Sequence, residues 1–237
     1  LIADDADDLG DVSGTVSVSI ASSGKIGVKV VSAGKTSSLS GYSCACTDDF
    51  VQIDLRDQRG NWCELVFDMS PGNDGRARLS GKVGTKDAEW NVSGGTAQAL
   101  ARAGVTDVVE KLARIGTFGA LTESVHAGSG FLVCPGCEPP PSKPSLMFTV
   151  NRNGTIRSSG KIEGRSVTGS SVLQVSGTGD DAVLFADFYD YRKGKGKLAY
   201  RVKFSAEWIR EGYDTRDSVV AGGSYAFDCE GCQPTIR

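Results

Sequence analysis

A long segment of this chain occurs twice, and no other feature of the sequence limits the fold as strongly. Residues 15 to 55 recur, with substitutions, at residues 145 to 188. The match is closest in the pattern Asp-(Leu/Phe)-x-Asp-x-Arg, whose two occurrences lie a constant 133 positions apart. A repeated unit of this size predicts a fold built from two related halves. The matching residues are Asp54, Asp57 and Arg59 in the first copy and Asp187, Asp190 and Arg192 in the second.

Alternation of apolar and polar residues predicts β-strands in both copies. In the first copy, Val16, Val18 and Ile20 alternate with small residues, and the alternation resumes on a return strand after a Ser-Ser-Gly-Lys turn. The 31 glycines against 7 prolines suit many short strands joined by tight turns. We therefore predict an all-β fold of two related antiparallel halves, each a meander or barrel-like sheet with one buried face.

The segment between the copies carries the one clear helical pattern. Residues 96 to 103 and 106 to 114 are predicted to form two short helices, with Gly104 weakening the join and Gly116 ending the second helix. Their apolar residues share one face, which we expect to cover a sheet. These residues are Leu100, Val105, Val108, Val109, Leu112 and Ile115.

These patterns divide the chain into four segments. An acidic leader occupies residues 1–13, a first β-repeat residues 14–95, a short helical connector residues 96–116, and a second β-repeat with a closing C-terminal strand residues 117–237. The leader holds five carboxylates, which we interpret as a solvated run because the calcium-loop pattern with its distal glutamate is missing. Residues 208 to 212 are predicted to form a turn or a short strand.

A second repetition bears on how the sheets close. Residues 223 to 234 are similar in sequence to residues 128 to 139. The predicted strand with its Cys-x-x-Cys motif therefore occurs both before and after the second copy, whereas no such segment precedes the first copy. Two explanations are open. Either the first copy lost its opening strand, or the strand at residues 218 to 227 closes the sheet of the first copy, as in a circularly permuted pair.

Charge and composition exclude several classes of function. The net charge of -3 leaves no broad basic surface, so nucleic acid is not expected as a partner. No run of about 18 apolar residues occurs, so we expect no helix that spans a membrane. The single histidine, His126, excludes sites that need two imidazoles, and we expect it to be exposed in a polar turn.

Seven cysteines limit the chemistry further. Each of two Cys-x-x-Cys motifs follows a predicted strand, and we favour disulfides, within each motif or with the other cysteines. A structural zinc or iron held by both motifs, and free thiols, are the alternatives. No other cofactor is expected. The motif cysteines are Cys134, Cys137, Cys229 and Cys232, and the others are Cys44, Cys46 and Cys63.

The duplicated aspartates invite comparison with glycoside hydrolases, which need two carboxylates at a fixed separation. An interval of three residues, however, places Asp54 and Asp57 on opposite sides of a strand. We expect one to face solvent and the other to cap the turn that leads to Arg59. Because the whole motif is present in both copies, we predict a structural role and no catalytic residue.

Two groups of residues suit polysaccharide binding. The basic turn at residues 192 to 197 lacks the Gly-Lys-Ser/Thr ending of a phosphate-binding loop and is suited to sulfated or carboxylated polysaccharide. The tryptophans offer aromatic faces for sugar stacking, with positions in the core as the alternative. The candidate binding residues are Trp62, Trp90, Trp208, Arg192, Lys193 and Lys195.

The turn and strand motifs of both halves resemble a bacterial repeat family. They are Gly-Lys-Ile-x-x-Lys from Gly24, Gly-Lys-Thr from Gly34, Leu-Ser-Gly-Lys-Val at residues 79–83 followed by Trp90, and Gly-Thr-Phe-Gly-Ala-Leu at residues 116–121. Similar β-repeats occur in tandem in large secreted or surface proteins of Planctomycetes, Verrucomicrobia and Lentisphaerae-type bacteria. The resemblance covers most of both halves, implies an extracytoplasmic location, and transfers no catalytic residue.

We therefore predict a non-enzymatic, extracytoplasmic bacterial surface, adhesive or assembly module. The expected partners are polysaccharide, other surface proteins or further copies of the chain, because a missing first strand suits pairing between chains. A carbohydrate-binding module is the alternative, and a glycoside hydrolase-like enzyme is the third interpretation.

Overall fold

The computed structural model describes residues 14–42, 45–47, 50–68, 78–95, 97–121, 132–133, 145–162, 164–216 and 219–228. Most of these residues lie in β-strands, and the helices are short, so the predicted all-β class is confirmed. The expected acidic leader, residues 1–13, lies outside the described residues.

The first half of the chain forms two antiparallel sheets. One is a meander in the order β1-β2-β3, and the other has the order β4-β5-β6-β7-β8. Their inward residues share one core, so we call them the first sheet pair. The strands are β1 (Gly14–Ile20), β2 (Lys25–Ser32), β3 (Lys35–Tyr42), β4 (Ala45–Cys46), β5 (Phe50–Arg56), β6 (Trp62–Asp68), β7 (Arg78–Gly84) and β8 (Glu89–Gly95).

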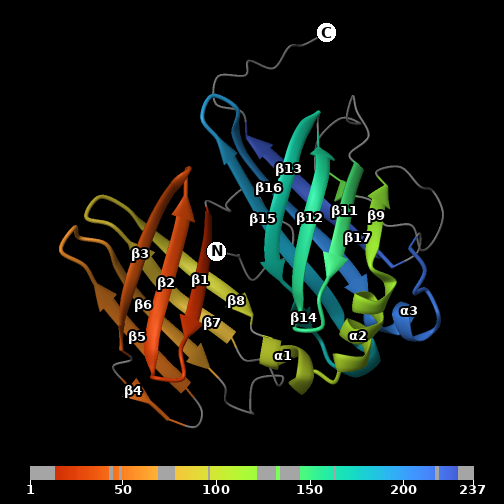
Figure 1. Ribbon diagram of the computed structural model, residues 1–237, viewed down its shortest axis with the longest axis horizontal. Helices are drawn as coiled ribbons and strands as arrows, with labels where there is room; N and C mark the ends of the chain where they lie inside the picture. The colour runs from red at the N-terminus through yellow and green to blue at the C-terminus, as the bar shows by residue number, and fades with distance from the viewer. Residues whose placement is uncertain are drawn as a thin grey trace.

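The second half also forms two sheets around one core, the second sheet pair. Their strand orders are β13-β12-β11-β9 and β10-β17-β16-β15-β14, with only the β10–β17 contact parallel among the described strands. Figure 1 shows the two sheet pairs side by side. The strands are β9 (Thr117–Leu121), β10 (Leu132–Val133), β11 (Ser145–Val150), β12 (Thr155–Ile162), β13 (Arg165–Val172), β14 (Gln174–Ser176), β15 (Val183–Arg192), β16 (Gly196–Ser205) and β17 (Gly222–Asp228).

Period-two alternation explains both cores. In β2, Ile26, Val28 and Val30 are buried and pack with inward residues of β5 to β8. In the second sheet pair, aromatic side chains extend the core, with Phe118 and Phe204 packed edge to face at 5.8 Å. Each sheet thus buries one face against its partner, as sheet-on-sheet packing requires.

The helices lie where the sequence predicts two of them. They are α1 (Ala97–Arg102) and α2 (Thr106–Ile115), and their predicted apolar face belongs to the core of the second sheet pair, which confirms that it packs on a sheet. The turn or short strand predicted at residues 208 to 212 is wrong at its first three residues, which belong to the third helix, α3 (Ala206–Arg210), while residues 211 and 212 form a turn. Ser205 starts this helix because its hydroxyl accepts a hydrogen bond from the backbone of Trp208. None of the described helices has the length and apolar character to cross a membrane.

The C-terminal strand belongs to the second sheet pair. β17 pairs with β16 and β10 rather than with the first copy, so the circularly permuted closure is wrong. The described strands form four open sheets, and the barrel-like closure of each half is not seen among them.

The two sheet pairs meet at the turn between β2 and β3. Ala33 and Gly34 of this turn both have positive φ, 47° and 73°, which is the conformation of a tight two-residue hairpin. The backbone of Ala33 hydrogen-bonds to the phenol of Tyr189, and the ring of Tyr191 lies directly against Gly34. Burial raises the pKa of Tyr189, and the hydrogen bond to Ala33 opposes part of that shift.

We expect Gly34→Ala to destabilise the protein more than Gly24→Ala. Both glycines have positive φ, 73° and 79°, but an added Cβ at Gly34 would lie 2.9 Å from Tyr191, whereas nothing lies within 4 Å of one at Gly24. Backbone strain costs each variant about 1 kcal/mol, and the clash adds about 1 kcal/mol or more at Gly34. Urea unfolding measures the difference, and equal losses would show that the turn does not contact Tyr191.

Candidate functional site

The duplicated aspartate motif lies on corresponding strands of the two sheet pairs. Asp54 is on β5 and Asp187 is on β15, and both strands form a hairpin with the strand that follows. Directly across the hairpin, Asp54 faces Glu64, whereas Asp187 faces Arg201. The motif aspartate therefore faces a residue of the same charge in the first copy and a residue of the opposite charge in the second. The two aspartates thus lie in different electrostatic environments.

Asp187 and Arg201 form a buried ion pair. Their side chains are 9% and 5% exposed, and Nε of Arg201 lies 2.6 Å from Oδ1 of Asp187. Nη2 of Arg201 donates to Oδ2 at 3.1 Å, and the guanidinium lies over the ring of Phe185 at 4.7 Å. Gln174 adds a contact to the carboxylate at 3.4 Å. Removing either member of a pair this buried would leave the other charge without its counterion, which is strongly destabilising.

Asp190 forms a second arginine pair at the other end of β15. The Arg165 side chain, 5% exposed, donates from Nε to Oδ2 of Asp190 at 2.9 Å. Its Nη1 also donates to the carbonyls of Lys195 and Gly196, both at 3.1 Å. Arg165 thus ties β13 to the basic turn between β15 and β16, through the carbonyl groups of Lys195 and Gly196.

In the first copy the aspartates behave as the sequence predicts. The Asp54 side chain is 41% exposed and lies 3.6 Å from Nε of Arg56. Asp57 caps the turn, since its Oδ1 accepts from the backbone N–H groups of Arg59 and Asn61 at 2.8 and 2.9 Å. Its Oδ2 accepts from the Asn61 side chain, and these hydrogen bonds lower the pKa of Asp57. Asp57, Asp187 and Asp190 thus make contacts that stabilise the fold, whereas Asp54 lies at the surface.

The basic turn predicted to meet acidic polysaccharide is a hairpin tip. Lys193 and Lys195 are exposed, while Arg192 bonds the carbonyl of Ser166 and lies 3.3 Å from Asp190. Arg192 therefore points back toward β13, and the two lysines carry the charge that faces solvent.

The structure places the three candidate tryptophans at three separate sites. Trp90 on β8 lies opposite the fully buried Val83 and packs against the first core. Trp62 on β6 lies opposite Gly84, on the other face of the same sheet. Trp208 is on α3 in the second sheet pair, with its ring 5.9 Å from that of Tyr213. A platform made from all three is not assembled.

Trp62 belongs to a polar row on the outward face of β5 to β8. Across this sheet, Arg56 pairs with Trp62, Trp62 with Gly84, and Gly84 with Glu89. The neighbouring row contains Asp54, Glu64 and Lys82. We call this surface the Trp62 face, and its charged side chains are about half exposed. It comprises Asp54, Arg56, Trp62, Glu64, Lys82 and Glu89.

Most of the predicted cysteine chemistry falls outside the described residues. Cys44, Cys134, Cys137, Cys229 and Cys232 lie there, as does His126. Cys46 is in β4, and Cys63 on β6 is fully buried in the first core. Within the described part of the chain, no group of three or more His, Cys, Asp or Glu side chains is placed to hold a metal ion.

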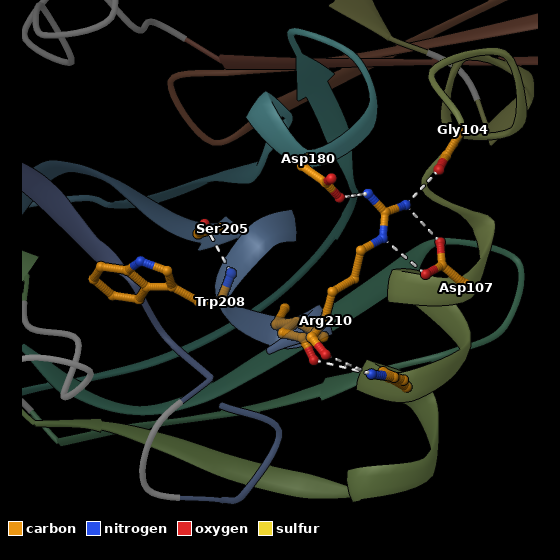
Figure 2. A network of polar contacts seen from close by, with 8 residues as sticks. Gly104, Asp107, Asp180, Ser205, Trp208 and Arg210 are labelled. Carbon is orange, nitrogen blue, oxygen red and sulfur yellow. Dashed lines mark hydrogen bonds and ion pairs between the residues drawn. The ribbon is translucent and has the colours of Figure 1, made fainter. Parts of the chain in front are cut away.

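Sequence reasoning missed three arginines that organise the second sheet pair: Arg165, Arg201 and Arg210. Figure 2 shows Arg210 of α3 reaching Asp107 of α2, Asp180 and the carbonyl of Gly104, at 2.8, 2.7 and 2.6 Å. The hydrogen bond from Arg210 lowers the pKa of Asp107. One side chain thus ties α3 to the α1–α2 junction. The sequence held a signal for Arg201, since this residue lies in the largely apolar segment Leu-Ala-Tyr-Arg-Val, where a charge needs a partner.

Strand β1 offers the second accessible feature of the first sheet pair, an open edge. Among the described residues it pairs with β2 alone, so one side of its backbone makes no ladder contact. Its sequence, Gly-Thr-Val-Ser-Val-Ser-Ile, contains neither charge nor proline, and Ile20 is 52% exposed. It is the longest such uncharged edge among the described strands, and uncharged edges are open to pairing with another strand.

No protein-family model, curated protein or solved structure matches the chain.

We expect Asp187→Asn to cost about 3 kcal/mol of unfolding free energy, because it leaves the Arg201 charge buried without its counterion. The matched control is Asp54→Asn, at the same motif position 133 residues earlier but 41% exposed, which we expect to change stability by less than about 0.5 kcal/mol. Chemical denaturation of both variants measures the difference. Equal effects would contradict a structural role for the buried pair.

Proposed function

We propose that the chain is an assembly module whose open β1 edge accepts a strand from a second copy of the chain. The observation that carries the proposal is the contrast between β1 and β11. β11 has β9 on the edge that corresponds to the open edge of β1.

The correspondence rests on an internal duplication, which we propose from topology. Strands β1 to β7 follow the order and pairing of β11 to β17, and β2 and β3 each have eight residues, as do β12 and β13. The first hairpin turns also match. Gly24 and Gly154 have φ of 79°, and each closes a turn in which residue 21 or 151 donates to the carbonyl four residues later.

The hydrogen-bond alternation identifies which β1 groups face the open edge. The N–H of Ala21 donates to the carbonyl of Lys25 at 2.9 Å. Antiparallel pairs alternate between bonded and non-bonded, so with this register Ser19 and Ser17 bond to β2, while the N–H and C=O groups of Val18 and Val16 point outward. Their counterparts on β11, Phe148 and Leu146, lie opposite Phe118 and Ala120 of β9.

A second copy of the chain fits this edge better than an unrelated ligand. The outward groups form a regular row that only another extended backbone can satisfy in register. In the second sheet pair, β11 pairs at the corresponding edge with the uncharged antiparallel strand β9, and this supports pairing of the same kind at β1. We also place the module outside the cytoplasm, on a bacterial surface, with the resemblance to secreted repeats and the seven cysteines as support.

We expect the wild-type chain to self-associate and Val18→Pro to prevent it. Proline at residue 18 removes an N–H that points to the open edge and leaves the bonds to β2 in place. The matched control is Ser38→Pro on β3, the opposite edge of the same sheet, where the N–H also points outward by the same alternation.

Sedimentation equilibrium in reductant, over a range of protein concentrations, measures the effect without disulfide crosslinks. Val18→Pro should raise the dissociation constant at least about tenfold, and Ser38→Pro should leave it unchanged. Thermal melts check that both variants fold. A wild-type chain that stays monomeric at millimolar concentration, or equal effects of the two prolines, would contradict the proposal.

A further inference from the structure

Beyond self-assembly, we propose that the Trp62 face binds the pyranose rings of a neutral polysaccharide. The face lies on the first sheet pair, and its argument does not depend on the β1 edge.

The indole of Trp62 lies flat on the sheet because Gly84 leaves room for it. An added Cβ at Gly84 would be 2.6 Å from Cε2 and 2.7 Å from both Cζ2 and Nε1 of the indole, so the ring covers the glycine. An aromatic ring laid across neighbouring strands presents its other face away from the sheet. Such a surface suits stacking against the C–H face of a sugar ring.

The guanidinium of Arg56 lies over the indole ring of Trp62. Its central carbon lies 6.0 Å from the ring centroid, at the outer limit of a cation–π contact. Nη2 of Arg56 bonds Glu64 at 2.7 Å, which keeps the guanidinium beside the ring. The Arg56 side chain is 64% exposed, so it can move aside when a ligand binds.

The charges around the indole are paired. Lys82 bonds Glu89 at 2.6 Å, and this hydrogen bond raises the pKa of Lys82, which therefore stays a cation at neutral pH. With the Arg56–Glu64 pair, each cation lies beside an acceptor. A sugar hydroxyl both donates and accepts, so it can bond to both members of such a pair.

Charge balance selects a neutral polymer over an acidic one. Three carboxylates, Asp54, Glu64 and Glu89, outnumber the two cations of the face, so a polyanion would meet net repulsion there. The exposed lysines of the basic turn, Lys193 and Lys195, belong to the second sheet pair. Acidic and neutral polymers would therefore bind at different places, and the two can be distinguished by mutation.

The described strands of the second sheet pair do not repeat this surface. On the outward face of β15 and β16, the Asp187 and Arg201 side chains are less than a tenth exposed, and Ala199 is 2% exposed. We therefore assign one neutral-polysaccharide site to the described part of the chain.

Affinity electrophoresis tests the proposal, with native gels containing laminarin, glucomannan, amylopectin or hydroxyethyl cellulose. We expect at least one of these gels to retard the wild-type chain. Trp62→Ala should weaken binding by on the order of tenfold or more, and Trp62→Phe should keep part of it, because phenylalanine retains an aromatic face.

Two controls make the result specific. Trp208→Ala changes a half-buried tryptophan in the other sheet pair and should leave the retardation unchanged. The monomeric Val18→Pro variant should also bind, which separates this site from assembly. Circular dichroism confirms that each variant folds.

Three outcomes would overturn the proposal. The first is the absence of retardation in every neutral gel. The second is retardation that Trp62→Ala does not change. The third is retardation confined to gels with heparin or alginate and lost when Lys193 and Lys195 are both changed to Ala, which would move the polysaccharide site to the basic turn.

Discussion

The backbone groups at the edges of a sheet must be paired, covered or left to water, and this requirement governs how the rest of the molecule is arranged. In the second sheet pair, β9 covers the edge of β11, so the meander there has four strands. In the first sheet pair, the equivalent meander has three described strands and stops at β1. Because the two meanders are otherwise alike in strand order among the described residues, the open edge of β1 is a local difference between them, and the proposed assembly rests on this edge.

Polar contacts within its core stabilise the second sheet pair. Three buried polar side chains, Ser158, Arg165 and Arg201, are all bonded, and Ser158 contacts the phenol of Tyr200. Burial raises the pKa of Tyr200 to about 12, so it stays protonated within this core. The helices add apolar surface, and Arg210 joins α3 to α2 through Asp107. Such bonded networks fix one arrangement of a core. The first sheet pair contains no helix among its described residues and displays its polar side chains on the Trp62 face.

Much of the fold follows from local patterns, whereas the candidate sites depend on register. Alternation in β1 and β2 and the helical stripe of α2 are visible in a few residues, so the strands and both connecting helices are predictable. Asp54 and Asp187 occupy the same motif position, yet Glu64 lies opposite Asp54 and Arg201 lies opposite Asp187. Whether the aspartate forms an ion pair across the hairpin therefore depends on the residue in the opposite strand. The α3 helix was missed because its start depends on a single capping serine, Ser205.

Amide hydrogen exchange at single-residue resolution, followed by NMR at low and high protein concentration, tests the assembly account most directly. The account predicts that the amides of Val16 and Val18 exchange quickly in dilute solution and become protected as the concentration rises. The amide of Ser17, which already bonds to β2, should be protected at both concentrations. Self-association that leaves Val16 and Val18 unprotected would contradict the account, because the contact between chains would then lie away from the β1 edge.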